Sequence, residues 1–160
     1  MDVRSFPRDW CPVGAAVDYF GDRWMLLVLR EAFFGVRQFE ELLRNTGAAR
    51  NILTNRLGRL VEGGILEKQL YSERPPRSEY RLTEKGIDLW PVIIAMSSWG
   101  QKWGELEAGP PIRLEHKGCG AVMEPRLTCP ECGEALDARS VRVVPGPAIL
   151  ASAGRLDESA

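Results

Sequence analysis

The chain lacks the features that place a protein in or across a membrane. It has 160 residues, of which 44% are hydrophobic, but none of its apolar runs approaches the roughly 18–20 residues that span a bilayer. The first ten residues, MDVRSFPRDW, also lack the apolar stretch of a signal peptide. We therefore expect a cytoplasmic protein with no membrane partner.

Catalytic residue sets are missing as well. The chain has a single histidine and shows no Ser/His/Asp set, no glycine-rich phosphate loop and no paired catalytic carboxylates. Its four cysteines are Cys11, Cys119, Cys129 and Cys132, and the last three cluster. In a chain expected to lie in the reducing cytoplasm, clustered thiols favour metal binding over disulfides. We do not expect an enzyme.

Charge is balanced over the whole chain but not along it. The net charge of −1 at pH 7 gives no general argument for nucleic-acid binding. Residues 37–81, however, contain nine Lys or Arg against six Glu. This local positive excess is informative only together with a DNA-binding motif.

The spacing of apolar residues predicts a mainly α chain with one hairpin. Helices are expected over residues 11–20, 23–34, 38–44 and 48–62, and strands over 65–71 and 78–82. A long helix is expected over 83–107, bent by Pro91 unless that proline lies within the first turns. The turn Asn45-Thr46-Gly47 between two short helices is typical of a helix-turn-helix.

The helix over 48–62 has the composition of a DNA-reading helix. Its apolar stripe of Ile52, Leu53, Leu57 and Leu60 leaves a polar and basic outer face. That face contains Arg50, Asn51, Thr54, Asn55 and Arg59, with Arg56 near its border. Arginine pairs with guanine and asparagine with adenine in the major groove, where we expect this helix to bind. The alternative is an ordinary solvated helix face.

A basic tip joins the two predicted strands. Arg74 and Arg77 flank Pro75-Pro76, which hold the tip extended. Such a loop, over residues 72–78, suits the negative potential of a narrow minor groove, although charged hairpin loops are common on any surface. Arg37 and Gln38, before the preceding helix, are placed for phosphate contacts. Together these elements predict a winged helix-turn-helix that binds double-stranded DNA.

Short motifs within residues 10–104 match one family. They are Cys11-Pro12-Val13, Gly21-Asp22-Arg23-Trp24, Phe34-Gly35, LTNRL at 53–57, PPRSEY at 75–80 and LTEKG at 82–86. In these motifs the chain resembles the HxlR-type branch of bacterial winged-helix regulators, akin to the MarR superfamily. The resemblance implies a cytoplasmic homodimer that binds operator DNA as a repressor or an activator. It names no effector molecule and does not explain residues 110–160.

The long predicted helix favours a dimer on physical grounds too. Its large apolar side chains offer more area than one thin winged helix can cover, and aromatic residues and methionine suit interface cores. They are Trp90, Val92, Ile93, Met96, Trp99 and Trp103. The alternative is that they pack on their own domain. A twofold dimer would bind a pseudo-palindromic operator with half-sites about 34–36 Å apart.

A linker at Gly109-Pro110-Pro111 divides the chain. We expect a winged-helix DNA-binding and dimerisation domain at residues 10–108, a small β-rich zinc-ribbon-like module at 112–144 and a flexible tail at 145–160. The full expected fold is therefore a mainly α winged helix-turn-helix with a two-stranded β wing, followed by that module.

The expected module contains the spacing of two zinc knuckles. His116 and Cys119 form one pair and Cys129 and Cys132 the other, and a glycine follows the second cysteine of each pair. One imidazole and three thiolates suit a tetrahedral structural Zn²⁺, which would supply the folding energy of the module. The alternatives are a metal-free loop with reduced thiols and a redox dithiol of Cys129 and Cys132.

Cys11 stands apart, at the start of the first predicted helix. The resemblance makes it a candidate sensor of oxidants or electrophiles, and a buried structural cysteine is the alternative. Two rival functions follow from these features. One is a thiol-based redox-sensing regulator, and the other is an adaptor that binds proteins of the transcription machinery. Affinity that falls steeply with salt would separate DNA binding from the adaptor.

Overall fold

The computed structural model describes residues 7–74 and 76–151, which belong to two compact units. Residues 16–109 form the winged-helix unit, and the segments before and after them form the second unit. The division after Gly109 coincides with the Gly-Pro-Pro segment of the sequence.

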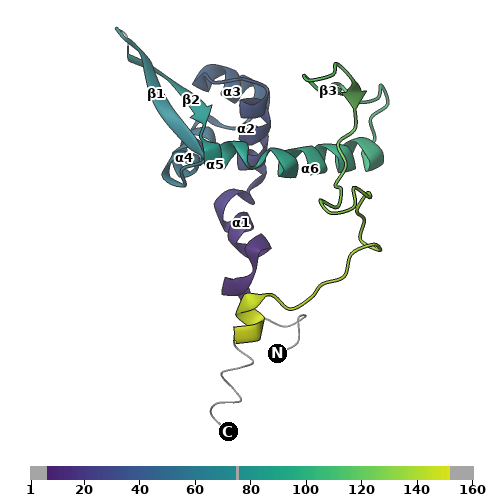
Figure 1. The fold of residues 1–160 in the computed structure, drawn as a ribbon. Helices are drawn as coiled ribbons and strands as arrows, with labels where there is room; N and C mark the ends of the chain where they lie inside the picture. Colours follow the sequence, from purple (N-terminus) through teal and green to yellow (C-terminus); the bar gives the residue numbers. More distant parts are fainter. Residues whose placement is uncertain (1–6, 75, 152–160) are drawn as a thin grey trace. The chain divides into compact units, whose positions relative to one another are not determined.

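The winged-helix unit is mostly helical with one two-stranded antiparallel sheet (Figure 1). This confirms the coarse fold predicted from the sequence. The chain begins with η1 (Arg8–Trp10), which belongs to the second unit, and α1 (Pro12–Phe20), whose last residues begin the winged-helix unit. The other elements of the winged-helix unit are α2 (Arg23–Phe33), α3 (Phe39–Thr46), α4 (Arg50–Glu62), β1 (Leu66–Glu73), β2 (Pro76–Leu82), α5 (Glu84–Ile87) and α6 (Trp90–Trp103).

The core of this unit lies where α2, α3 and α4 meet the start of β1. Its buried apolar residues are Met25, Val28, Leu29, Leu42, Ala48, Leu53, Leu57, Leu60, Ile65 and Leu66. The three leucines of α4 recur at helical spacing and are fully buried. Each such side chain contributes roughly 1.5–3 kcal/mol by leaving water, so this stripe fixes the rotation of α4 about its own axis.

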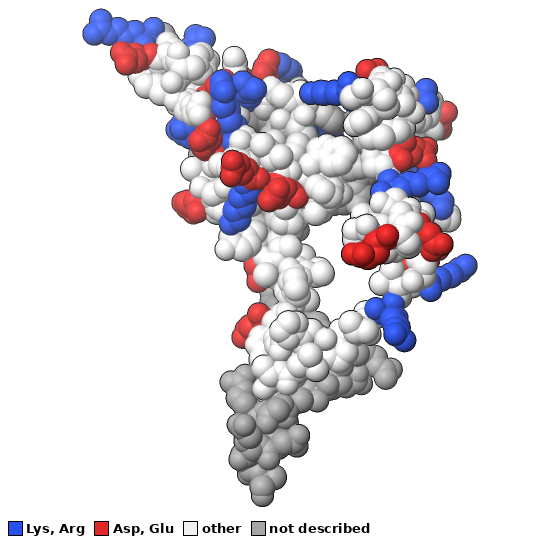
Figure 2. Space-filling view, in the orientation of Figure 1, with Lys and Arg blue, Asp and Glu red and all other residues white. Residues whose placement is uncertain are grey.

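The wing is the β1–β2 hairpin. The strands pair from Leu66 opposite Leu82 to Glu73 opposite Pro76, with an irregularity between Leu70 and Ser72. Figure 2 shows Lys and Arg side chains gathered at the tip of this hairpin. At its base, the Tyr80 N–H donates to the Arg37 carbonyl at 2.9 Å, so the segment before α3 is attached to the wing.

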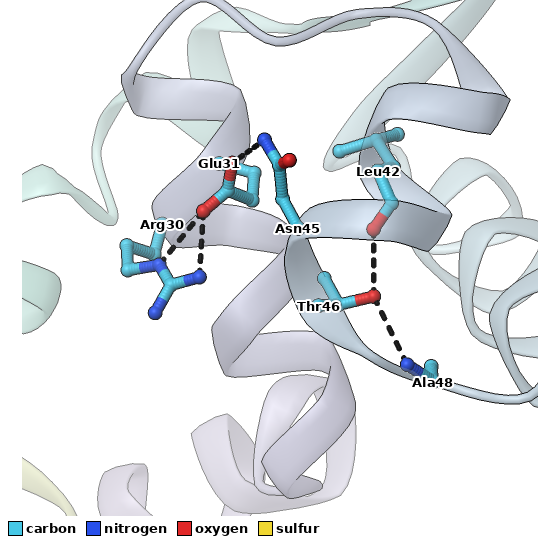
Figure 3. Close-up of polar contacts among 6 residues, drawn as sticks. All are labelled: Arg30, Glu31, Leu42, Asn45, Thr46 and Ala48. Carbon is cyan, nitrogen blue, oxygen red and sulfur yellow. Dashed lines mark hydrogen bonds and ion pairs between the residues drawn. The ribbon is translucent and has the colours of Figure 1, made fainter.

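A buried carboxylate joins α2 to the end of α3 (Figure 3). Glu31 is only 5% exposed, and it accepts hydrogen bonds from Arg30 at 2.6 Å and Asn45 at 2.7 Å. Beside it, the Thr46 hydroxyl donates to the Leu42 carbonyl and accepts from the Ala48 N–H. Leaving such a buried group unpaired costs about 1–3 kcal/mol, so these contacts hold the turn before α4 in one geometry.

The prediction of one long helix over 83–107 is wrong, because the segment forms α5 and α6. Thr83 caps α5 by accepting the Gly86 N–H, and its hydroxyl donates to the Gly64 carbonyl. Pro91 lies in the first turn of α6, where its missing N–H breaks no helical hydrogen bond. In the described ranges, the structure has no helix with the length and apolar character needed to span a membrane.

The second unit has little regular structure after the linker. β3 (Leu114–Glu115) pairs antiparallel with β4 (Val122–Met123), and Thr128 bridges Ala135. Among residues 110–151 none is buried, so this segment has no apolar core. The predicted flexible tail contains a short helical stretch at residues 147–151, and its residues 152–160 lie outside the described part of the chain. Two short strands are present, but they do not by themselves establish the zinc-ribbon-like module.

Candidate nucleic-acid interface

The outer face of α4 is polar and exposed, because the leucine stripe occupies the opposite face. Five of the six predicted contact residues on this helix are exposed: Arg50, Asn51, Thr54, Asn55 and Arg59. Ile52, which the sequence places in the apolar stripe, is half-buried against the core. The structure thus leaves these five side chains accessible to a partner.

Arg50 is held in position by α3. Its Nη1 and Nη2 each donate to a carboxylate oxygen of Glu40 at 2.9 Å, and its guanidinium lies 5.1 Å from the centre of the Phe39 ring. The hydrogen bonds lower the pKa of the Glu40 carboxyl and raise the pKa of the Arg50 guanidinium. The pair is exposed and contributes little to stability, but it orients a guanidinium at the start of α4.

Arg56 differs from the other predicted contact residues. It is half-buried, and its Nη2 donates to Oδ2 of Asp22 at 2.9 Å. Oδ1 of the same Asp22 accepts the N–H groups of Trp24 and Met25, which caps α2. The Arg56 hydrogen bond holds the pKa of Asp22 below its usual range. Arg56 therefore fastens α4 to the start of α2, an arrangement that favours a structural role.

Three further residues of α4 have polar contacts within the unit. Nη2 of Arg59 donates to the Asp18 carbonyl of α1 at 3.3 Å. The Thr54 hydroxyl donates to the Arg50 carbonyl, one turn earlier in α4. Asn55 accepts a hydrogen bond from Arg56 at 2.7 Å through its side-chain oxygen. Both ends of the exposed face of α4 are thus anchored, at Arg50 to α3 and at Arg59 to α1.

The wing carries the other predicted contacts. Arg74 and Arg77 are exposed near the hairpin tip, where Ser72 pairs with Arg77. Pro75, half of the expected stiffening pair, lies outside the described residues. Arg37 and Gln38 are also exposed, and Gln38 is the residue before the first turn of α3. These residues and the face of α4 all belong to the winged-helix unit.

The roles of Glu40 and Asp22 as partners of these arginines were not predicted from the sequence. Glu40 precedes Arg50 by ten residues, and Asp22 precedes Arg56 by thirty-four. Neither separation matches a helical repeat, so no local pattern connects the partners. An acidic residue directly before an apolar helix is a capping signal, and this signal could have identified Asp22 as an N-cap.

The predicted metal ligands form two pairs rather than one group. The Nδ1 atom of His116 lies 3.2 Å from Sγ of Cys119. The backbone N–H groups of Cys132 and Glu131 donate to the Cys129 sulfur, which lowers the pKa of that thiol. In the described part of the chain, no three His, Cys, Asp or Glu residues gather in a metal-binding group. The four-ligand cluster expected from the sequence is therefore not assembled, because no apolar core holds the two turns together.

Cys11 lies immediately before α1 and is half-buried. Its sulfur accepts the Gly14 N–H at 3.3 Å, within the first turn of the helix. This position agrees with the sequence-based expectation of a cysteine at a helix start, and it leaves part of the thiol accessible.

The chain matches the HxlR-like helix-turn-helix family over residues 19–108. The chain belongs to this family. It is 49% identical to an uncharacterized HTH-type transcriptional regulator of Mycobacterium tuberculosis, Rv3095, over 87% of this chain and 88% of the relative. A regulator of the same kind from Synechocystis, sll1512, is 42% identical over 61% of this chain and 73% of the relative.

Solved structures of transcription regulators are similar to this chain, and one of them extends the similarity beyond α6. The crystal structure of PA1607, a candidate transcription factor, superposes with a TM-score of 0.74 at 33% identity, covering 86% of this chain and 96% of that chain. The redox regulator HypR in its oxidized form gives a TM-score of 0.57 at 31% identity, covering 60% of this chain and 100% of HypR. These proteins are transcription regulators, not enzymes, which confirms the prediction that the chain is not an enzyme.

The residues after the linker are shared with two of these proteins. The matches to Rv3095 and PA1607 leave only about one seventh of the chain uncovered, so they include more than half of the residues after Gly109. The family match, in contrast, ends at residue 108. The second unit therefore accompanies the winged helix in a subset of related chains.

The Asp22–Arg56 contact leads to a prediction about stability and pH. Asp22→Ala removes both the cap and the ion pair and should lower the free energy of unfolding at pH 7 by about 1–3 kcal/mol. Asp22→Asn keeps a capping oxygen, so it should lower the free energy of unfolding by less than Asp22→Ala does. Because the folded-state pKa of Asp22 is lowered, its contribution is present above the ordinary value of 3.8 and is lost as the pH falls below it.

Urea unfolding of the three proteins between pH 3 and 8 measures this effect. The gap between wild type and Asp22→Asn should be constant above about pH 5 and should narrow towards pH 3. Asp88→Asn, at an exposed aspartate, is the matched control and should behave as wild type. Equal stability of Asp22→Asn and wild type throughout this range would contradict the assigned ion pair.

Proposed function

We propose that the chain is a transcriptional regulator that binds operator DNA as a homodimer, with α4 in the major groove and the wing in the minor groove. The observation that carries this proposal is the exposed face of α4, which combines arginine and asparagine side chains with a basic hairpin on the same unit. Helices of this size fit the major groove, where both residue types can read base edges. Family membership supports the same function.

The predicted contact residues have two kinds of proposed role: some recognise DNA, and one positions α4. Arg50, Asn51 and Asn55 have the side chains that recognise guanine or adenine edges. Arg74 and Arg77 provide charge at the wing, and Arg37 with Gln38 lies where phosphates approach the start of α3. Arg56 is assigned to positioning, since its guanidinium binds the cap of α2 rather than facing outward.

Exposed apolar side chains support the homodimer. Trp99 and Trp103 of α6 are 68% and 66% exposed, and Val13 and Val17 of α1 are also exposed. The inner side of α6 packs on the core through Ile93. Packing of α6 on its own domain, the alternative to a dimer, therefore accounts for that side only. Large exposed apolar surface marks an interaction site. A second copy of the chain, related by twofold symmetry, would cover the exposed side of α6 and would place two α4 helices on one operator.

A redox-responsive regulator is the second candidate function. The partly accessible Cys11 thiol at the start of α1 favours it, and the solved structures similar to this chain include HypR, which is described as a redox regulator. In this proposal, oxidation of Cys11 alters DNA binding through α1. The adaptor function has no comparable support among the contacts and relatives described above.

The reading face can be tested by substitution. Arg50→Ala and Asn55→Ala should each relax base preference at one position, with losses of about 1–3 kcal/mol at the preferred base, whereas Arg74→Ala should weaken binding to most sequences. Selection of bound duplexes from a random library measures preference, and titration at several salt concentrations measures affinity. Arg126→Ala, an exposed arginine of the second unit, is the control.

An unaltered profile in all three variants would contradict the assigned face. Wild-type affinity should fall steeply with salt, since each phosphate contact releases counterions. Flat salt dependence without a preferred operator would instead support the adaptor.

The dimer interface can be tested separately. The double variant Trp99→Asp/Trp103→Asp should be monomeric and folded, because both side chains are exposed and contribute little to the core. Light scattering after size exclusion gives the mass, and circular dichroism reports folding. Leu127→Asp, at a 73% exposed leucine outside α6, should leave the mass unchanged. A double variant with the mass of the wild-type dimer would rule out this face of α6 as the dimer interface.

The redox candidate makes a different prediction. Cys11→Ser should abolish any loss of operator affinity on treatment with hydrogen peroxide, while leaving affinity under reducing conditions intact. Fluorescence anisotropy with a selected operator measures both affinities. If the serine variant responds to peroxide as wild type does, Cys11 is not the sensor.

A further inference from the structure

A carboxylate lies on the surface proposed to meet DNA. Glu40 is in the first turn of α3, and its side chain is 66% exposed beside the start of α4. Phosphates repel a carboxylate, so an acidic residue at this place lowers affinity for any duplex that approaches it. The position of Glu40 is therefore explained by its contacts within the protein rather than by attraction of DNA.

Glu40 holds one edge of the Arg50 guanidinium. Nη1 and Nη2 of Arg50 donate to Oε1 and Oε2 of Glu40, each at 2.9 Å, and this bidentate form fixes the relative orientation of the two planar groups. The guanidinium also lies 5.1 Å from the centre of the Phe39 ring, and Phe39 packs against the core. The first turn of α3 thus holds the guanidinium from two sides.

The backbone between the two partners is fixed as well. α3 ends at Thr46, whose buried hydroxyl donates to the Leu42 carbonyl at 2.7 Å and accepts the Ala48 N–H at 3.4 Å. Ala48 is buried, and α4 begins shortly after it at Arg50. Packing therefore sets the separation of Glu40 and Arg50, so the two side chains meet without further ordering of the backbone.

The pair neutralises Arg50 but leaves it donors. A guanidinium has more N–H groups than Glu40 accepts, so the Nε–H and the outer N–H groups of both Nη atoms are not used by the carboxylate. Attraction of phosphates depends on net charge, whereas recognition of guanine depends on two donors aimed at O6 and N7. Pairing with Glu40 therefore weakens the first property of Arg50 and retains the second.

The arginines of the wing differ from Arg50 in this respect. Within the described residues, neither Arg74 nor Arg77 forms an ion pair. Both side chains are exposed, so their full charge is available to the phosphates of any sequence. The winged-helix unit thus has unpaired arginines at the wing and a paired arginine at the start of the helix proposed to read bases.

We propose that Glu40 is a positioning residue that determines the sequence specificity of DNA binding by acting through Arg50. This inference rests on the proposed function, operator binding by α4. By neutralising Arg50, Glu40 lowers affinity for DNA of unrelated sequence. By fixing the plane of the guanidinium, it favours a guanine that the operator presents in the matching orientation. The ratio of affinities for operator and unrelated DNA therefore depends on this acidic side chain.

Glu40→Gln tests the inference, because glutamine has nearly the same shape as glutamate and no charge. Fluorescence anisotropy at several salt concentrations measures affinity of the full chain for a selected operator and for a scrambled duplex. Release of Arg50 to a phosphate should raise affinity for the scrambled duplex about 5-fold at about 0.15 M salt and steepen the log–log salt slope by about 0.9. Selection from a random library should show at least about a 5-fold loss of preference at the base pair whose preference Arg50→Ala relaxes.

Glu41→Gln is the matched control. Glu41 lies in the same turn of α3 and has the same charge, but it is half-buried and is not the partner of Arg50. Its substitution should show only the general effect of one lost negative charge and should keep the wild-type base preference. Thermal unfolding followed by circular dichroism should be the same in both glutamine variants, which separates changes in binding from misfolding.

A double-mutant cycle tests whether Glu40 acts through Arg50. In the Arg50→Ala background, Glu40→Gln should change affinity for the scrambled duplex no more than Glu41→Gln does, because no guanidinium is released. An undiminished effect of Glu40→Gln in that background would overturn the inference, since Glu40 would then act without Arg50.

The remaining outcomes distinguish this inference from the proposed function. A wild-type chain that selects no preferred duplex would overturn both. A wild-type chain that selects an operator, together with a Glu40→Gln variant that matches Glu41→Gln in base preference and in affinity for the scrambled duplex, would overturn the role of Glu40 alone.

Discussion

The burial of one leucine stripe of α4 against α2 is the constraint on which the rest of the winged-helix unit depends. Leu53, Leu57 and Leu60 are fully buried, and rotation of the helix by one residue would expose at least one of them. The cost of several kcal/mol is large beside the few tenths contributed by an exposed ion pair. Apolar packing therefore determines that the arginine and asparagine side chains face outward, and polar contacts only refine their positions.

The polar contacts differ between arginines that look alike in the sequence. Arg50 and Arg56 lie on the same helix, yet one binds the exposed Glu40 and the other binds the half-buried Asp22 at the N-cap of α2. The first contact can exchange for a base edge without disturbing the core. The second cannot, because breaking it would remove the guanidinium that binds the capping carboxylate of Asp22. Exposure of the partner, rather than residue type, distinguishes Arg50, which is proposed to read bases, from Arg56, which is proposed to position α4.

The same distinction explains what the sequence could and could not predict. Local sequence patterns, helical spacing for α4 and strand and turn signals for the wing, were sufficient because both elements depend on neighbours a few residues away. They failed at the predicted helix over 83–107, where Thr83 caps α5 and Pro91 suits the start of a new helix. They also missed Glu40 and Asp22, whose partners are brought close only by packing. The knuckle spacing predicted one four-ligand zinc site, but in the described part of the chain these residues do not gather in one group, because spacing gives no information on the distance between the two turns.

α6 contributes both to the core and to the surface proposed for dimer formation. Its inner side packs on the core through Ile93, while Trp99 and Trp103 remain exposed further along the same helix. One rigid helix therefore connects the core that orients α4 to the surface proposed for the second copy. Because a helix transmits displacement along its length, a change in packing at its inner side would shift the separation of the two α4 helices in a dimer. Operator spacing of about 34–36 Å would then be set by the same apolar contacts that stabilise the monomer.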